Sequence, residues 1–319
     1  MTGSGEAERP LVLQTERLHE ESAGWLAARC TLVRAAPGEP AFEEAIPRAR
    51  ALVVRTYTRV DEALLARAPN LCVVGRAGVG LDNIDVSACH ARGISVVYTP
   101  DANTAAVVEY VFALLLDALR PRTVLDQAIP AAQWVELRRN LSASRQLSNL
   151  TLGVYGFGRV GSRVARVASA FGMRVLFHDL LDIPEAARGG ALVVAREVLL
   201  RESDVVSIHV DGRASNRNLL DRDALEQMKS DAVLVNTSRG FVVDARALAD
   251  WLRTHPTALA LLDVHEPEPF DPAYPLLSLA NARLSPHLGA ATATSDRNMS
   301  SVVRDVWRVL NGEPPELAY

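Results

Sequence analysis

The chain has 319 residues and a mass of 34.5 kDa, which at the usual size of domains corresponds to about two domains. Apolar residues make up 49% and charged residues 23% of the chain, a globular composition that excludes wholesale disorder. A net charge of −4 provides no basic face for a nucleic acid. The three cysteines, Cys30, Cys72 and Cys89, cannot form a disulfide framework and are expected to be reduced.

No segment predicts secretion or membrane insertion. The first ten residues have no apolar core like that of a signal peptide. The most apolar stretch, residues 105–119, is too short to span a bilayer and contains Glu109 and Asp117. We therefore expect a cytoplasmic protein with no membrane partner.

The first hundred residues alternate short β-branched runs with helical segments. Residues 51–54, 71–74 and 94–97 are predicted strands, and residues 61–67 form one of the helices between them. A long apolar helix over 104–119 follows, with Thr104 as its N-cap. This alternation indicates a parallel sheet with helices on its faces.

The middle of the chain repeats the same alternation on a larger scale. A helix over 159–171, with apolar residues at helical spacing, separates the first two of six predicted strands. The six strands are 151–155, 174–178, 205–210, 232–236, 258–263 and 282–284. A last helix over 291–310 has little sheet left to cover there, so we expect it to pack on the first unit.

The predicted fold class is therefore α/β, with two domains built on doubly wound parallel sheets. The first domain is expected to be discontinuous and to comprise residues 1–103 and 287–319. Residues 104–286 are expected to form the second domain.

Three glycines between a predicted strand and a predicted helix have the spacing of a dinucleotide-binding turn. Gly156 permits the tight turn, Gly158 lets a pyrophosphate approach the backbone, and Gly161 allows close packing of helix on strand. The helix N-terminus offers free N–H groups to the phosphates. The pattern alone is weak, but the strand before it and the helix after it supply its structural context.

Asp179 follows the next strand, near the position expected for the acid that binds the ribose hydroxyls. Leu180 and Leu181 come next, so no arginine is in place for a 2′-phosphate. The sequence predicts NAD rather than NADP as the cofactor. The alternative is a structural glycine turn followed by a solvated aspartate.

Three polar segments follow later strands, where an open α/β sheet places its ligand crevice. In the segment NTSRG, Arg239 suits a carboxylate that accepts two parallel hydrogen bonds. In SPHLGA, His287 could exchange a proton with a hydroxyl. In LDVHEPEP, Glu268 could hydrogen-bond the imidazole and fix its tautomer. Each residue alone is more often a surface or loop residue, and only their combination behind a dinucleotide-binding turn favours a catalytic site.

The chain resembles the D-2-hydroxyacid dehydrogenase family over nearly its whole length. GRAGVGLDNID, TPDANT, GFGRVG, NTSRG, LDVHEPEP and SPHLGA occur in the family's order and spacing. The resemblance implies two Rossmann-like domains, with residues 1–103 and 287–319 as the discontinuous substrate domain and residues 104–286 as the nucleotide-binding domain. It also implies an NAD-dependent oxidoreductase without a metal and a homodimer built on the nucleotide domain. It implies that Arg239 binds the substrate, His287 is the acid/base and Glu268 is its partner. It also implies that NAD lies among Val79, Gly156, Gly158, Arg159, Val160, Gly161, Asp179, Thr237, Ser238, Asp263 and Gly289, with Asp263 at the carboxamide.

Within the family, VRTYTRV and GRAGVGLDNID are most similar to D-3-phosphoglycerate dehydrogenases. This similarity implies a small anionic 2-hydroxy or 2-oxo acid bound by Arg55, Arg76, Gly78, Asn103 and Arg239. Arginines beyond Arg239 suit a phosphate as well as a carboxylate. We therefore expect D-3-phosphoglycerate as the substrate and a role in serine biosynthesis. Because the sequence ends at Tyr319, we expect no C-terminal regulatory domain.

Two alternatives remain open at this point. One is a glyoxylate or hydroxypyruvate reductase, and the other is an NAD(H)-sensing corepressor-like binding module. The chain also departs from the family's pattern, because HVDGRASN at residues 209–216 replaces the usual HVPLTP. Contacts of this loop with the cofactor are therefore in doubt.

Overall fold

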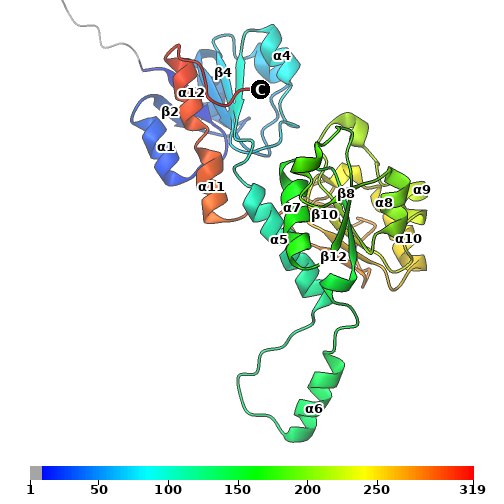
Figure 1. Cartoon of the computed structure of the whole chain (residues 1–319). Coiled ribbons are helices and arrows are strands. Elements are labelled where there is room, and N and C mark those ends of the chain that lie inside the picture. The colour runs from blue at the N-terminus through cyan, green and yellow to red at the C-terminus, as the bar shows by residue number, and fades with distance from the viewer. Residues whose placement is uncertain (1–8) are drawn as a thin grey trace, which may run out of the picture. The chain divides into compact units, whose positions relative to one another are not determined.

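The computed structural model describes residues 9–319, so the expectation for residues 1–10 lies almost wholly outside the described part. The chain divides into two compact units, residues 1–103 with 290–319 and residues 104–289 (Figure 1). The boundaries between these units lie at 103/104 and 289/290. Among the described residues, no helix is long and apolar enough to cross a membrane.

The first unit contains a five-stranded parallel sheet in the order β2-β1-β3-β4-β5. Its strands are β1 (Leu11–Gln14), β2 (Thr31–Arg34), β3 (Ala51–Val54), β4 (Val73–Arg76) and β5 (Ser95–Tyr98). Its helices are α1 (Glu20–Ala27), α2 (Pro40–Ala45), α3 (Glu62–Ala66), α4 (Val86–Ala91), α11 (Ala293–Ser300) and α12 (Val303–Leu310). Because β2 and β3 lie on opposite sides of β1, the strand order reverses at β1.

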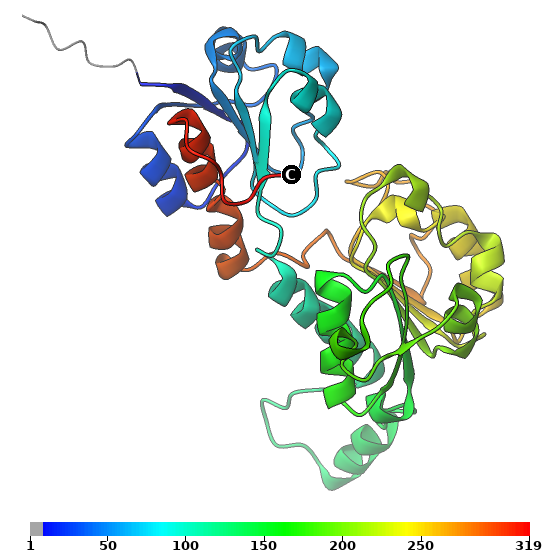
Figure 2. The same cartoon turned by 45° about the horizontal axis from the view of Figure 1, so that its top comes forward.

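Both faces of this sheet are covered, which explains why all four residues of β3 are buried. Leu52 and Val54 belong to an apolar cluster with residues of α2, α3 and α4 on one face, and Ala51 and Val53 belong to a cluster with residues of α1 and α12 on the other. Figure 2 shows α12, near the C-terminus, beside α1, near the N-terminus. A Cβ atom on Gly75 of β4 would lie 2.4 Å from Val306 Cγ2 of α12, so the glycine permits this close packing.

The predicted packing of the last helix on the first unit is found, but this helix is interrupted. Residues 301–302 separate α11 from α12. Two predicted strands begin one or two residues late, at Val73 and Ser95. β1 and β2 were not predicted, because neither contains the two consecutive valines that are present in β3, β4 and β5.

The second unit contains a seven-stranded parallel sheet in the order β12-β11-β10-β9-β6-β7-β8. Its strands are β6 (Thr151–Tyr155), β7 (Arg174–His178), β8 (Leu192–Val193), β9 (Val205–Ile208), β10 (Val233–Asn236), β11 (Leu259–Leu262) and β12 (Ala282–Leu284). Its helices are α5 (Thr104–Leu119), α6 (Ala131–Asn140), α7 (Arg159–Ala170), α8 (Arg196–Glu202), α9 (Arg222–Glu226) and α10 (Ala245–Thr254). The six predicted strands are all present, with ends shifted by at most two residues.

Helices α5 and α7 cover one face of this sheet and α8, α9 and α10 cover the other. Strand β6 lies between β7 and β9, which makes its carboxyl end the point where the strand order reverses. Ligands of open α/β sheets bind in the crevice at such a point. The sequence did not predict β8, which has two residues, or α6, which has no buried residue.

Candidate active site

The turn after β6 requires glycine at two of its three glycine positions. Gly156 has φ +92°, and a Cβ atom there would lie 2.7 Å from the backbone oxygen of His209. A Cβ atom on Gly161 would lie 2.0 Å from the oxygen of Gly156. A side chain at either position would clash with the backbone, so the packing of the turn against α7 and the end of β9 requires glycine at both.

Gly158 differs, because a Cβ atom there meets no atom within 4 Å. The protein leaves this space open at the N-terminus of α7, whose first residue is Arg159. The Oγ1 atom of Thr237, after β10, is buried without a hydrogen-bond partner. The open space and the unpaired hydroxyl fit a bound dinucleotide at this edge of the sheet.

Asp179 lies directly after β7 and connects two turns. One carboxylate oxygen accepts a hydrogen bond from the N–H of Phe157, at 2.5 Å, and the other accepts from the N–H of Leu181, at 2.8 Å. A carboxylate has about four acceptor positions, so two remain for ribose hydroxyls. Leu180 and Leu181 beside it are largely exposed.

Asn236 at the end of β10 fixes the turn that carries Arg239. Its side-chain oxygen accepts from the N–H and hydroxyl of Ser238, at 3.0 and 2.8 Å, and its amide donates to the carbonyl of Arg239 at 2.9 Å. The Arg239 guanidinium donates to the carbonyl of Ser238 at 2.7 Å. The sequence analysis did not assign a role to Asn236.

His287 and Glu268 form a hydrogen-bonded pair. Nδ1 of His287 lies 2.8 Å from a carboxylate oxygen of Glu268, and the two side chains are 40% and 26% exposed. Because a carboxylate only accepts, Nδ1 carries the proton and Nε2 of a neutral imidazole has a free lone pair. Burial raises the pKa of Glu268, but hydrogen bonds from His287 and from the N–H of His265 bring the pKa below its ordinary value.

The backbone around His287 is held by two buried residues. Asp263 is 1% exposed and accepts hydrogen bonds from the Ser285 hydroxyl and from the N–H groups of Leu288 and Gly289, at 2.7 to 2.8 Å. His265 is 6% exposed, and its Nε2 lies 2.8 Å from the carbonyl oxygen of Ser285. His287 itself has φ +56°, a conformation uncommon for a residue with a side chain. The sequence analysis placed Asp263 near the cofactor and overlooked its contacts with this loop.

His265 also contacts Glu268, because its backbone N–H donates to the second carboxylate oxygen at 2.8 Å. Its ring packs edge-on against Phe270 and Tyr274, with centroids 4.9 and 5.6 Å away. His265 therefore contacts Glu268 through its backbone and the segment two residues before His287 through its ring. The sequence analysis missed His265, although it lies within the LDVHEPEP segment that supplied Glu268.

The loop over residues 209–216 is ordered by its own side chains. Asp211 pairs with Arg213, and Asn216 donates to the backbone and side chain of Asp211 at 2.9 and 3.0 Å. The hydrogen bond from Arg213 lowers the pKa of Asp211. Burial holds the pKa of His209 far below its ordinary value, so this ring is neutral. Asp211 and Arg213, the two charged residues of the segment that departs from the family's pattern, thus pair with each other.

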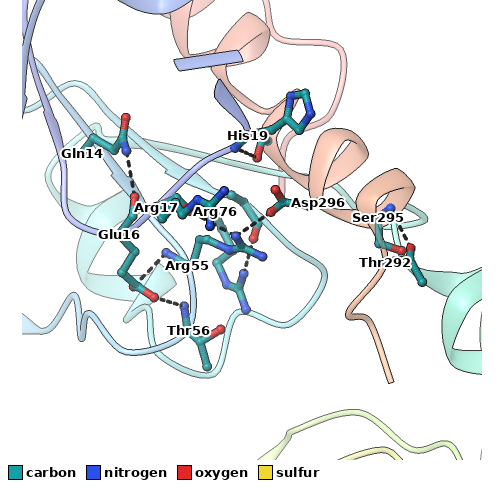
Figure 3. Close-up of polar contacts among 12 residues, drawn as sticks. Gln14, Glu16, Arg17, His19, Arg55, Thr56, Arg76, Thr292, Ser295 and Asp296 are labelled. Carbon is teal, nitrogen blue, oxygen red and sulfur yellow. Dashed lines mark hydrogen bonds and ion pairs between the residues drawn. The ribbon is translucent and has the colours of Figure 1, made fainter. Parts of the chain in front are cut away.

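In the first unit, three arginines lie at or just beyond the carboxyl ends of the neighbouring strands β1, β3 and β4. Arg17 comes after β1, Arg55 after β3, and Arg76 ends β4 (Figure 3). Arg55 donates to Asp296 of α11 at 2.7 Å and to the carbonyl of Arg17 at 3.1 Å. Arg17, Arg55, Arg76, Glu16 and Asp296 are called the arginine cluster below.

Gly78 makes room for Arg76. It has φ +150°, and a Cβ atom on it would lie 2.0 Å from Nη1 of Arg76, which donates to the carbonyl of Ala77 at 2.6 Å. The predicted substrate residues Arg55, Arg76 and Gly78 are therefore brought together. Asn103 is the last residue of this part of the first unit and is half-buried, as is Val79.

Glu16 holds the loop that carries Arg55 and was not predicted. Its carboxylate accepts hydrogen bonds from four consecutive backbone N–H groups, those of residues 55–58, at 2.8 to 3.1 Å. Burial raises the pKa of Glu16, but the four hydrogen bonds together lower it by more, so the pKa lies below its ordinary value. Asp296 was missed as well, because 241 positions separate it from Arg55.

Comparison with known proteins agrees with this geometry. Residues 112–289, more than half of the chain, match the model of the D-isomer specific 2-hydroxyacid dehydrogenase NAD binding domain. The chain therefore belongs to the D-isomer specific 2-hydroxyacid dehydrogenase family, and these residues form its NAD-binding domain. Among residues 9–319, no group of three or more His, Cys, Asp or Glu could hold a metal ion.

Relatives with different substrates are similar to the chain. D-3-phosphoglycerate dehydrogenase of Archaeoglobus fulgidus is 35% identical over 95% of this chain and 58% of its own length. Glyoxylate reductase of Aeropyrum pernix is 38% identical over 83% of this chain and 82% of its own. The structure of Aquifex aeolicus D-lactate dehydrogenase with NAD and lactic acid is 28% identical, with a TM-score of 0.81 over 95% and 96% of the two chains. The chain spans between half and three fifths of the length of the phosphoglycerate dehydrogenases that it matches.

Proposed function

We propose that the protein is an NAD-dependent oxidoreductase that transfers hydride between C2 of a small D-2-hydroxy acid and the nicotinamide. The observation that carries the proposal is the His287–Glu268 pair, whose Nδ1–H is held by the carboxylate at 2.8 Å. This geometry leaves Nε2 of the partly exposed imidazole available for a proton.

In oxidation, Nε2 of His287 takes the hydroxyl proton, and the Glu268 carboxylate stabilises the imidazolium that forms. Arg239 holds the substrate carboxylate in a position fixed by Asn236. NAD, when bound, accepts the hydride that leaves C2, so the hydroxyl carbon becomes a carbonyl carbon. In reduction, the protonated His287 returns its proton to the carbonyl oxygen.

The arrangement around Asp179 supports NAD over NADP. Its carboxylate retains acceptor positions for ribose hydroxyls, and the next two residues are leucines. We assign the open space at Gly158 to the pyrophosphate and the unpaired hydroxyl of Thr237 to a contact with the cofactor. Arg159, Val160, Ser238, Asp263, Gly289 and Val79 belong to the same proposal.

Two substrates are candidates. D-3-phosphoglycerate is supported by the convergence of Arg55 and Arg76 and by similarity to phosphoglycerate dehydrogenases. Glyoxylate or hydroxypyruvate is supported by the Arg55–Asp296 pair, in which a protein carboxylate already faces one of these arginines. If D-3-phosphoglycerate is the substrate, we further propose a role in serine biosynthesis and a cytoplasmic location.

The test is NADH oxidation with phosphohydroxypyruvate, hydroxypyruvate, glyoxylate and pyruvate, compared by kcat/KM. A preference of about a hundredfold for the phosphorylated acid, which corresponds to two good charged hydrogen bonds, supports D-3-phosphoglycerate. A flat profile or a preference for glyoxylate supports the reductase. Absence of turnover with every acid would contradict the proposed function itself.

We also propose a homodimer built on the second unit. Helix α6 has no buried residue and lies at the end of a long excursion of this unit (Figure 1). Trp134 and Val135 on it are 50% and 66% exposed. An exposed apolar surface of this kind commonly marks a protein interface. Sedimentation should show a dimer that the Trp134→Asp change weakens, while Tyr57→Asp, at an exposed aromatic residue of the other unit, serves as the control.

A further inference from the structure

The arginine cluster has a defined backbone frame, which fixes where Arg55 begins. Glu16 accepts hydrogen bonds from the four N–H groups of residues 55–58. On the other side of the loop, Asn83 donates to the carbonyls of Arg55 and Thr58, at 3.0 and 2.7 Å. The backbone at Arg55 is therefore fixed by hydrogen bonds, and the direction of the guanidinium depends on the contacts of the side chain itself.

Those contacts involve one nitrogen of the guanidinium. Nη1 of Arg55 donates to Asp296 at 2.7 Å and to the carbonyl of Arg17 at 3.1 Å (Figure 3). Within residues 9–319, Nε and Nη2 of Arg55 make no hydrogen bond to another residue. An incoming anion could bind this other edge of the guanidinium while Asp296 keeps its place.

Asp296 is well held in that place. It lies in the first turn of α11, which Thr292 caps by accepting from the N–H of Ser295 at 3.1 Å. A carboxylate near a helix N-terminus is favoured by the helix dipole. The side chains of Arg55 and Asp296 are 25% and 29% exposed, so water screens their charges only in part.

From this geometry, and resting on the function proposed above, we infer that Asp296 is a specificity-determining residue. It penalises a substrate whose second polar group carries two negative charges and favours one that carries a single charge or none. The repulsion between Asp296 and an anion on Arg55 grows with the charge of the anion. A phosphate ester carries close to two charges at neutral pH, a sulfonate carries one, and a hydroxyl group carries none.

The competing explanation is that Asp296 only orients Arg55 for an anion. The two explanations predict different effects on kcat/KM for a phosphorylated acid. If Asp296 acts through its charge, Asp296→Asn improves the use of a phosphorylated acid, because the amide oxygen still accepts from Arg55. If Asp296 only orients Arg55, Asp296→Asn has little effect and Asp296→Ala impairs that reaction.

The experiment compares kcat/KM for NADH-dependent reduction of phosphohydroxypyruvate, 3-sulfopyruvate and hydroxypyruvate. The proteins are the native chain, Asp296→Asn, Asp296→Ala, and Glu44→Gln as an exposed carboxylate control in the same unit. Asp296→Asn should raise kcat/KM about tenfold for the phosphorylated acid, about threefold for the sulfonate, and less than about twofold for hydroxypyruvate. An equal factor for all three acids, or a loss with the phosphorylated acid, would overturn the inference.

A binding measurement separates this inference from the proposed function. Calorimetric titration with inorganic phosphate, at a pH where it is mainly a dianion, should show tighter binding to Asp296→Asn than to the native chain. Methanesulfonate should show a smaller difference. Equal phosphate affinities would contradict the inference even if turnover is normal. Turnover that is absent in every variant, with the phosphate difference present, would contradict the proposed function alone.

Discussion

The two units present polar side chains at the carboxyl ends of their sheets in different ways. In the second unit, the groups assigned to chemistry lie in short continuous segments, and the contacts that hold them come from residues near in sequence or on adjacent strands. In the first unit, Arg55 is held by Glu16 and paired with Asp296, from segments 39 and 241 positions away. The groups proposed for the chemistry are thus positioned mainly by local sequence, and the charges proposed to surround the substrate are brought together only by the fold.

The sharpest test of this contrast is the His287→Ala change in the second unit. Loss of a general acid/base lowers kcat by about 10²–10⁴-fold. NADH affinity, measured by fluorescence titration, should stay within a factor of two or three because His287 lies outside the glycine turn. His90→Ala, at an exposed histidine of the first unit, is the control. Unchanged turnover of His287→Ala would remove this residue from the mechanism.

Glu268→Gln should have the next largest effect. It removes a charged hydrogen bond to the imidazolium, so kcat should fall by about 10- to 100-fold. Because the pKa of Glu268 is lowered in the folded protein, its stabilising contribution is present above the unfolded value of 4.5 and is lost as the pH falls through the folded value. Melting temperatures of the native and variant proteins should therefore differ at pH 7 and converge under acid conditions. A constant difference across that range would be evidence against this ionised pair.

Asp179→Ala tests the cofactor assignment. The change removes an acceptor for the ribose hydroxyls and a charge that repels a 2′-phosphate, so the preference for NADH over NADPH should fall by about tenfold. Because Asp179 also holds the N–H of Phe157, both cofactors could bind less well. The ratio of the two kcat/KM values is therefore the quantity to compare. A native protein that already prefers NADPH would show that Asp179 was misinterpreted.

His265→Ala should have the smallest effect of the four. It removes the hydrogen bond from Nε2 to the carbonyl of Ser285 and the edge contacts with Phe270 and Tyr274. A bond of this kind corresponds to a loss of about three- to tenfold in kcat, with little change in KM. His265→Gln, which keeps a donor, should recover part of the loss. Equal losses in both variants would indicate a packing role alone.

The contrast also explains how much the sequence could reveal. The helix over 104–119 and the strands 151–155 and 174–178 were predicted with their observed ends, because long or β-branched segments with glycine turns carry strong local patterns. The pairing of Glu268 with His287 was predicted from two adjacent strand ends, and the structure contains the bond. Their catalytic roles remain predictions.

Other features depend on tertiary structure that no local pattern encodes. Asp296 resembles an ordinary helix-terminal acid until α11 brings it to Arg55. In the sequence Gly78 is only one residue of the segment GRAGVGLDNID, whereas in the structure it leaves room for the Arg76 guanidinium. The break between α11 and α12 falls in a continuous helical pattern, at Ser301 and Val302.

The central claim of the proposed function is that hydride from the bound cofactor reaches one face of C2 of a small acid while His287 protonates the carbonyl oxygen. Its most direct test is reduction with NADH of whichever of phosphohydroxypyruvate, hydroxypyruvate and pyruvate is used best, because glycolate from glyoxylate has no stereocentre, followed by chiral analysis of the product from the native chain and from His287→Ala. The account predicts the D-isomer alone from the native chain and a rate reduced by at least about a hundredfold in the variant. The L-isomer, a racemic product, or equal rates from both proteins would contradict it.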